Sequence, residues 1–151
     1  NVTGVQTCAL PIFQTGKGVL RLSNDDVYEG QFKRGKREGY GIYRFANKDT
    51  YEGNFLKGKA NGKGVIKFSN GDFYDGEFKE DHKHGFGKMI FANKTIFEGE
   101  WKEDMMDGIG VLTDSSKNVY QGQFKENKRH GEGRLQFASH CALACMACQT
   151  F

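Results

Sequence analysis

Residues 28–50 read YEGQFKRGKREGYGIYRFANKDT, and close variants of this 23-residue stretch follow one another along most of the chain. Each variant opens with Tyr or Phe, an intervening polar residue and Gly, has an aromatic residue two positions later, and then carries a Gly-x-Gly pair. Self-similarity at a fixed period of about 20 to 50 residues is the signature of a repeat architecture. The repeated positions, which we predict to be structural, are Tyr28, Gly30, Phe32, Gly39, Gly41, Tyr51, Gly53, Phe55, Gly62, Gly64, Tyr74, Gly76, Phe78, Gly85, Gly87, Phe97, Gly99, Trp101, Gly108, Gly110, Tyr120, Gly122, Phe124, Gly131 and Gly133.

Inside each unit the residues alternate with a period of two, which is typical of β-strands. Tyr28, Gly30 and Phe32 fall on one face of a first strand, and the Gly-x-Gly pair shares one face of a second strand with Tyr43 and Phe45. Where a glycine lies opposite an aromatic residue, we expect the ring to lie flat on bare backbone. The fourth unit departs from this pattern, since Asp114 replaces the last apolar residue, and we predict a weaker repeat there.

Polar segments separate the predicted strands. Residues 33–37, 56–60 and 125–129 each centre on a residue that takes a positive φ readily, and Asn47 and Asn93 mark turns into the next unit. Each unit is therefore predicted to be a β-hairpin. One hairpin cannot bury its face alone, whereas stacked hairpins stabilise their neighbours. The expected fold is all-β, an elongated, twisted antiparallel sheet in a single-layer meander.

The array has boundaries that the sequence suggests directly. A half repeat at 14–27 precedes the units 28–50, 51–73, 74–96, 97–119 and 120–137. The segment Val2 to Ile12, VTGVQTCALPI, resembles a translated sequencing-library adapter, so we treat 1–13 as an artefactual or disordered leader. Residues 138–151 form a non-repeat tail, also expected to be disordered or artefactual. Its candidate zinc ligands, His140, Cys141, Cys145 and Cys148, crowd into nine residues, and we predict no metal site.

Composition narrows the function classes. With 22 basic and 19 acidic residues the net charge is only +3, which gives no support for nucleic-acid binding. No stretch approaches the roughly 20 apolar residues that cross a bilayer as a helix. No cysteine falls inside the repeats, so disulfides are not expected to hold the fold, which is compatible with a reducing compartment.

The repeated residues resemble the MORN (membrane occupation and recognition nexus) family, whose unit has the pattern Tyr-x-Gly-x-aromatic, a basic turn and Gly-x-Gly. The resemblance covers about Gly16 to Phe137. It implies an assembly module in the cytoplasm, in cytoskeletal, ciliary or membrane-peripheral structures, with self-association as a further expectation. Some members of the family are joined to enzymes such as lipid kinases, so a regulatory fragment of a larger enzyme is an alternative.

Catalysis is not predicted, and neither is a cofactor. His84 and His130 occupy one repeat position, where Glu38, Asn61 and Asp107 stand in other units, and a position that accepts all these residues indicates a solvated turn. Gly-x-Gly here lies inside strands and not between a strand and a helix, so it does not indicate a nucleotide site.

Two binding surfaces remain as hypotheses. The first is a protein-binding strip of strand residues that point away from the glycine face; these are Tyr40, Ile42, Val65, Phe86, Ile90, Ile109 and Val111. The second is attachment of basic turns to an anionic membrane, phosphoinositide or phosphatidic acid, where each Lys or Arg contributes about 1 kcal/mol. The turn residues are Lys33, Arg34, Lys36, Arg37, Lys57, Lys59, Lys125, Lys128 and Arg129.

Overall fold

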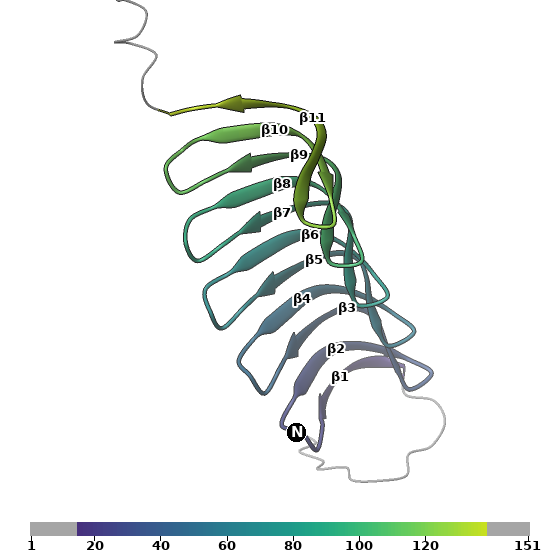
Figure 1. The fold of residues 1–151 in the computed structure, drawn as a ribbon. Coiled ribbons are helices and arrows are strands. Elements are labelled where there is room, and N and C mark those ends of the chain that lie inside the picture. The colour runs from purple at the N-terminus through teal and green to yellow at the C-terminus, as the bar shows by residue number, and fades with distance from the viewer. Residues whose placement is uncertain (1–14, 139–151) are drawn as a thin grey trace, which may run out of the picture.

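Within residues 15–138, each strand pairs with its neighbours in sequence, and eleven strands form one antiparallel sheet (Figure 1). The computed structural model describes residues 15–138, so the predicted leader, and the tail with its cysteines, lie outside the described residues. The predicted all-β, single-layer meander is confirmed. The strands are β1 (Gly16–Arg21), β2 (Val27–Lys33), β3 (Lys36–Arg44), β4 (Thr50–Leu56), β5 (Lys59–Lys67), β6 (Phe73–Lys79), β7 (His82–Ile90), β8 (Ile96–Lys102), β9 (Met105–Thr113), β10 (Val119–Lys125) and β11 (Lys128–Gln136).

Two kinds of turn alternate along the sheet. Inside a repeat the turn has only two residues, and both have positive φ, for example 50° at Arg34 and 73° at Gly35. This is the conformation of a type I′ turn, whose twist matches that of the strands. Between repeats the turn is longer: the Lys48 N–H donates to the Phe45 carbonyl at 2.9 Å, and Lys48 has a φ of 72°. The two-residue turns are shorter than the predicted polar segments, because the strands continue through the flanking residues.

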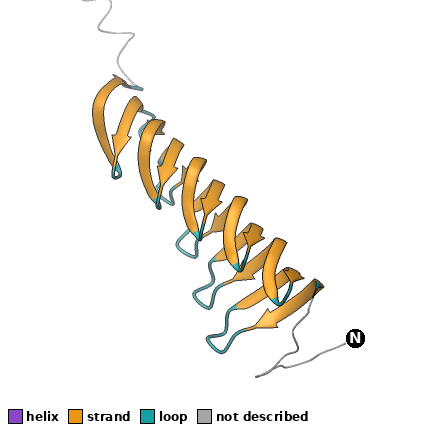
Figure 2. Ribbon diagram, turned by 90° about the vertical axis from the view of Figure 1, so that its right-hand side faces the viewer, coloured by secondary structure: helices purple, strands orange, loops and turns teal. Residues whose placement is uncertain are grey.

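A row of glycines crosses the whole sheet, one from each strand. Register pairs Gly18 with Gly30, Gly30 with Gly41, and so on to Gly133 in β11. A Cβ on Gly30 would lie 2.5 Å from the Cα of Gly41, and contacts of 2.3 to 2.5 Å recur at every later glycine of the row, so from Gly30 to Gly133 the row admits no side chain. Beside the row the register within each hairpin shifts, as between Gly30 and Phe32. The hairpins bend along their length (Figures 1 and 2), and these bulges account for the bend.

The first glycine of each Gly-x-Gly pair has a different role from the one that the sequence predicted. Gly39 does not lie under a ring; it has a φ of 81° and forms part of the bulge in β3. The side chain of Gln31 crosses this bulge, and its Oε1 accepts a hydrogen bond from the Tyr40 N–H at 3.2 Å. Glu100 and Gln123 bridge the bulges of later repeats in the same way. The positive φ at this position, and not packing of an aromatic ring over it, explains why the residue is glycine.

The core is a continuous series of aromatic rings. Consecutive ring centroids lie 4.9 to 5.3 Å apart with interplanar angles of 76° to 89°, the edge-to-face geometry that aromatic pairs prefer. We call this series the aromatic ladder. In order of contact its members are Phe32, Tyr28, Phe55, Tyr51, Phe78, Tyr74, Trp101, Phe97, Phe124 and Tyr120.

Each tyrosine of the ladder also makes a polar contact at the bulge. The Tyr28 hydroxyl donates to the Gln31 carbonyl at 2.8 Å, and Tyr51 donates to the Asn54 carbonyl at 2.9 Å. The ring thereby covers the glycines while its hydroxyl binds a carbonyl where the pairing of the strands is interrupted. Phe97 has no hydroxyl with which to make this bond in the fourth repeat.

Candidate functional site

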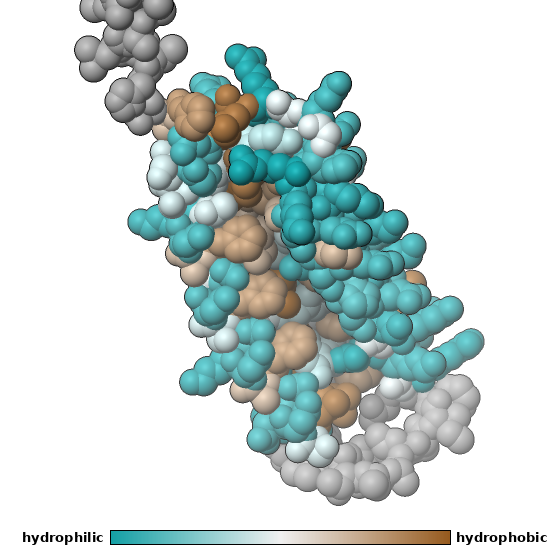
Figure 3. Space-filling view, in the orientation of Figure 1, coloured by the Kyte–Doolittle hydropathy of each residue, from teal (hydrophilic) through white to brown (hydrophobic). Residues whose placement is uncertain are grey.

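The concave side of the bent sheet carries an apolar surface (Figure 3). Its floor is the aromatic ladder. In the first full repeat Arg37, near the start of β3, and Phe45, directly after its end, both approach the ring of Tyr43, at 4.8 and 4.6 Å. Phe45 is 37% exposed, while Phe68 and Phe91 are partly buried against the core at the equivalent positions. We call this concave surface, with the row Phe45, Phe68 and Phe91, the trough. Figure 3 shows a column of apolar side chains that runs along the molecule between hydrophilic margins.

Basic side chains of the chain itself lie on rings in the trough. The Arg37 guanidinium carbon lies 5.8 Å from the centroid of Tyr28 and 5.4 Å from that of Phe55. Two repeats later, the Lys83 ammonium lies 4.8 Å from the ring of Trp101 and 5.6 Å from that of Tyr74. A cation within about 6 Å of a ring centroid is attracted by the negative face of the ring. Burial among these rings lowers the pKa of Lys83.

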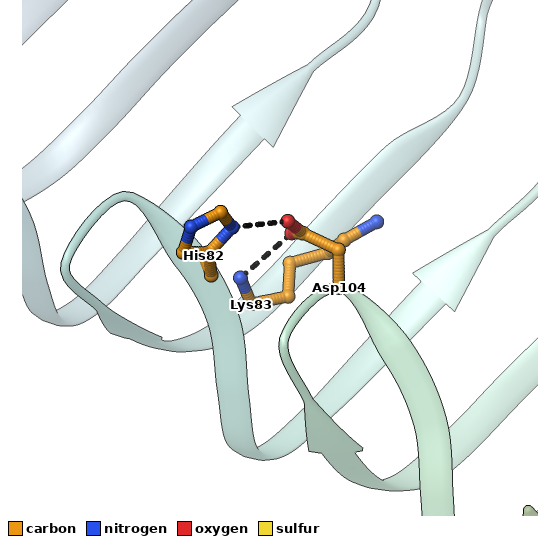
Figure 4. A network of polar contacts seen from close by, with 3 residues as sticks. All are labelled: His82, Lys83 and Asp104. Carbon is orange, nitrogen blue, oxygen red and sulfur yellow. Dashed lines mark hydrogen bonds and ion pairs between the residues drawn. The ribbon is translucent and has the colours of Figure 1, made fainter. Parts of the chain in front are cut away.

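Polar contacts between adjacent repeats hold the turn edge of the trough. The carboxylate of Asp104 accepts the backbone N–H of Lys83 at 2.8 Å and contacts Nδ1 of His82 at 2.6 Å (Figure 4). The hydrogen bond and the charge of Asp104 raise the pKa of His82. Asp81 and Asn127 accept the N–H of Ala60 and of Met106 in the same way, so the second turn residue joins its repeat to the preceding one.

The predicted protein-binding strip lies on the opposite, convex face and is not continuous. In register, Ile42 lies between Glu29 and Glu52, and Val65 lies between Glu52 and Asp75. Acidic residues therefore alternate with apolar ones along this row. Of the other predicted residues, Val111 lies in the same row as Ile42 and Val65. A second row contains Tyr40, Phe86 and Ile109, whose side chains are at least half exposed. Ile90 lies in a third row. A continuous apolar strip needs apolar side chains on neighbouring strands, and the strand register separates these apolar side chains from one another.

The basic turn residues share one edge of the sheet but do not form a uniform positive surface. Lys33, Lys59 and Lys125 each pair with a carboxylate, of Glu38, Glu80 and Asp107 respectively, at 3.5, 3.5 and 2.8 Å. The prediction that Arg37 projects from an exposed turn is wrong, because Arg37 lies in β3 and packs on aromatic rings. Arg129 likewise lies over the ring of Tyr120, at 5.4 Å. Arg34, Lys36, Lys57 and Lys128 remain at or beside the turns.

The histidines do not form a nucleophile–base arrangement in the part of the chain that the structure describes. His84 and His130 lie in β7 and β11 beside the bulge, not in the solvated turn that the sequence suggested, and His84 is half-buried. Within residues 15–138, no group of three or more His, Cys, Asp or Glu side chains lies close enough together to hold a metal ion. No helix in these residues is long and apolar enough to cross a membrane.

The geometry is matched by a family model. The MORN repeat model matches residues 28–50, 51–73, 74–96, 97–119 and 120–142, in the register of the glycine row. The chain belongs to the MORN repeat family. No curated protein matches it by sequence. Among solved structures it is similar to the TCP domain of SAS-4 (dCPAP) of Drosophila melanogaster, in complex with a proline-rich motif of Ana2 (dSTIL), with 17% identity, a TM-score of 0.41, and coverage of 79% of this chain and 70% of that chain.

Two features of this MORN array were not predicted from its sequence. The first is the bend, which turns the glycine face into a trough and moves the candidate binding surface to the face that we had assigned to the core alone. The second is the position that pairs with the second aromatic of each repeat, occupied by Arg37, Ala60, Lys83, Met106 and Arg129. Long side chains occupy this position in four of the five repeats. An alignment of the five repeats with one another would have identified this position from the sequence.

Proposed function

We propose that this MORN array is a non-catalytic scaffold whose trough binds an amphipathic helix of a protein partner. The observation that carries the proposal is the row of partly exposed rings, Phe45, Phe68 and Phe91, which stands above a floor that is already fully packed. The core does not need further burial from these rings. Apolar surface that remains in contact with water along a groove favours binding of another apolar surface.

The spacing of the row favours a helix as the occupant. Neighbouring strands lie about 4.8 Å apart, so equivalent rings of successive repeats are separated by roughly 9.6 Å. Seven residues of an α-helix rise about 10.5 Å. A helix with apolar residues at heptad spacing therefore places one apolar turn over each repeat, and a small tilt absorbs the difference. This is the helix-in-groove mode of recognition.

Attachment to an anionic membrane is supported less well. Three of the basic turn residues are paired with carboxylates, and Arg37 is packed in the trough, so fewer free cations face outward than the sequence suggested. Acidic turns at Glu80-Asp81 and Glu103-Asp104 interrupt the same edge. The membrane is therefore an alternative outcome of the experiment below.

The test uses the full chain and a fluorescent 21-residue peptide with leucine at heptad positions a and d and uncharged polar residues elsewhere. Anisotropy should report micromolar binding. Phe45→Asp and Phe91→Asp should each weaken it at least tenfold. Asp114 occupies the same row in the fourth repeat, so the array tolerates an aspartate there. Phe86→Asp, at a 57% exposed residue of the convex face, is the matched control and should bind as the original chain does.

The outcomes separate the candidate surfaces. Loss of binding only in Phe86→Asp would move the site to the convex face and overturn the trough. Absence of peptide binding, together with co-sedimentation on vesicles that contain phosphatidic acid and loss of that binding at high salt, would replace the trough with the membrane alternative. Circular dichroism and Trp101 fluorescence, identical among variants, would show that each substituted chain is folded.

A further inference from the structure

The turn edge of the trough changes the sign of its charge along the array. Each hairpin turn has a tip of two residues, and both have positive φ. The tips are Arg34-Gly35, Lys57-Gly58, Glu80-Asp81, Glu103-Asp104 and Glu126-Asn127. The first two tips therefore carry one positive charge each, the next two carry two negative charges each, and the fifth carries one negative charge.

The lysines directly before the tips belong to the convex face. Phe32 is part of the aromatic ladder and pairs in register with Arg37, which also faces the trough. The next residue, Lys33, lies on the opposite face because side chains alternate along a strand. Lys79 and Lys102 occupy the same position before the acidic tips. On the trough side they do not cancel the negative charge of these tips.

The floor of the trough experiences the same change of sign. Burial raises the pKa of both Tyr28 and Tyr51. At Tyr28 the charge of Arg37 opposes this increase, whereas at Tyr51 the charge of Asp81, in the third tip, adds to it. Lys83 offsets one of the negative charges of the third repeat, and the two acidic tips together still exceed it.

The opposite edge of the trough shows no comparable pattern. Lys48, Lys94 and Lys117 have positive φ in the turns between repeats, and Gly71 takes the equivalent place in the remaining turn. Aspartates accompany them in three of these four turns, which are residues 45–49, 68–72, 91–95 and 114–118. No net charge of one sign extends over two successive turns there, so only the turn edge divides the trough into a basic and an acidic half.

The two halves of the turn edge act separately on a bound segment. Successive repeats lie roughly 9.6 Å apart, so the centre of the two basic tips is roughly 19 Å from the centre of the next two, acidic tips. The Debye length at physiological ionic strength is about 8 Å. Each half of a helix in the trough therefore responds mainly to the tips beside it.

We infer that the partner helix is acidic over the first two repeats and basic over the third and fourth, and that the turn edge thereby fixes its direction and register. The inference rests on the proposed function, because the helix is the segment that occupies the trough. The row of Phe45, Phe68 and Phe91 cannot fix either property alone, since equivalent rings recur at a constant interval. The change from basic to acidic tips occurs at one place, between Lys57 and Glu80.

The test uses the full chain and three charged versions of the 21-residue leucine peptide. The positions that flank the leucines carry glutamate in the first half and lysine in the second, the reverse, or the two in alternation. At low salt each block peptide should bind about threefold more tightly than the alternating peptide. In about 1 M salt, where the Debye length is about 3 Å, the three should bind equally.

A nitroxide at the N-terminus of each block peptide reports its direction. In the glutamate-first peptide it should broaden the amide NMR signal of Gly35, and in the lysine-first peptide that of Asp104. The two peptides should thus lie in opposite directions along the same trough, each with its acidic half beside the basic tips.

Exchange of tip charges provides the matched variant. Arg34, Lys57, Glu80 and Glu103 occupy the same turn position, with φ between 48° and 51°, so the array already accepts both charges there. The combined variant Arg34→Glu, Lys57→Glu, Glu80→Lys and Glu103→Lys should abolish the advantage of the block peptides and broaden both ends. The control exchanges an ion pair of the convex face, Lys88→Glu with Glu98→Lys, and should retain both directions.

Each outcome decides the inference. Equal affinities of the three peptides at low salt, the same broadened end in both block peptides, or a preference that survives the tip exchange would overturn it. The neutral leucine peptide tests the proposed function separately. If that peptide binds and Phe45→Asp weakens it while the block peptides show no direction, only the charge inference fails. If the block peptides bind in the expected directions but Phe45→Asp has no effect on any peptide, the helix in the trough fails instead.

Discussion

The ring of Tyr51 in β4 covers Gly64 in β5 so closely that a Cβ atom on the glycine would lie 2.5 Å from the tyrosine hydroxyl oxygen. The same relationship recurs between Tyr28 and Gly41 and between Tyr74 and Gly87. The aromatic ring and the bare backbone under it are one structural unit, because neither position can change without moving the other.

Gly64→Ala should therefore destabilise the array strongly. The added methyl group displaces the Tyr51 ring, and through it Phe55 and Phe78, with which Tyr51 makes edge-to-face contacts. Overpacking of this kind costs about 1 to 3 kcal/mol, which urea denaturation measures. Gly35→Asn is the control: Gly35 has open space around it and a φ of 73°, which asparagine tolerates. An equal loss of stability in both variants would show that ring cover is not the cause.

Phe97→Tyr should stabilise the fourth repeat. The other repeats have tyrosine here, and its hydroxyl donates to a backbone carbonyl three residues later, as Tyr74 does to Glu77 at 3.1 Å. A hydroxyl on Phe97 would reach the Glu100 carbonyl, for a gain of about 0.5 to 1.5 kcal/mol in the free energy of unfolding. Tyr74→Phe should lose a similar amount. If Phe97→Tyr lowers stability instead, the ring at this position has no room for the hydroxyl group.

Asp81→Ala should weaken the contact between the second and third repeats. It removes the acceptor of the Ala60 N–H, at a cost of about 1 kcal/mol. Glu80→Ala is a matched control, because Glu80 and Asp81 occupy the same turn and both have positive φ, 49° and 74°. Glu80 makes only an exposed ion pair with Lys59, and its loss should cost less than about 0.5 kcal/mol. Hydrogen exchange of the Ala60 amide should rise in Asp81→Ala alone.

Stability should depend on pH through His82. Asp104 raises the pKa of His82, and Asp81 and Glu103 act in the same direction, so the folded chain binds this proton more tightly than the unfolded chain. The contribution is fully present below the unfolded pKa of about 6.5 and is lost as pH rises through the raised folded value. Between pH 6 and pH 8.5 the melting temperature should fall more in the original chain than in His82→Gln. Equal decreases in the two chains would exclude His82 as the cause.

The repeat period made most of the fold predictable. Positions such as Tyr28 and Gly30 recur in phase, and a period of two inside each unit identifies strands, so hairpins stacked in chain order follow directly. The bend did not follow, because it depends on bulges in which two extra residues of β3 stand opposite Gln31. Alternation alone assigns Gly39 to the face of Gly41, whereas its positive φ places it in the bulge.

The candidate site was less accessible to sequence reasoning for the same reason. Alternation without the bend predicts that Ile42 and Val65 are the apolar residues available to a partner and that Phe45 belongs to the core. Register then separates Ile42 from Val65 by Glu52, and the bend leaves Phe45 open above the ladder. Arg37 is an example. A basic residue two positions after a turn is predicted from sequence to be exposed to solvent, but the guanidinium of Arg37 lies on three rings.

The glycine row also restricts how the length of such a protein can change. One residue added within a strand would shift the side chains beyond it to the other face, and the row would meet side chains that it cannot admit. A segment of 23 residues restores every pairing, since each repeat touches only its neighbours. Insertions and deletions in such an array are thus expected to comprise whole repeats. A partner segment that spans the array is expected to change in length by the corresponding fixed increments.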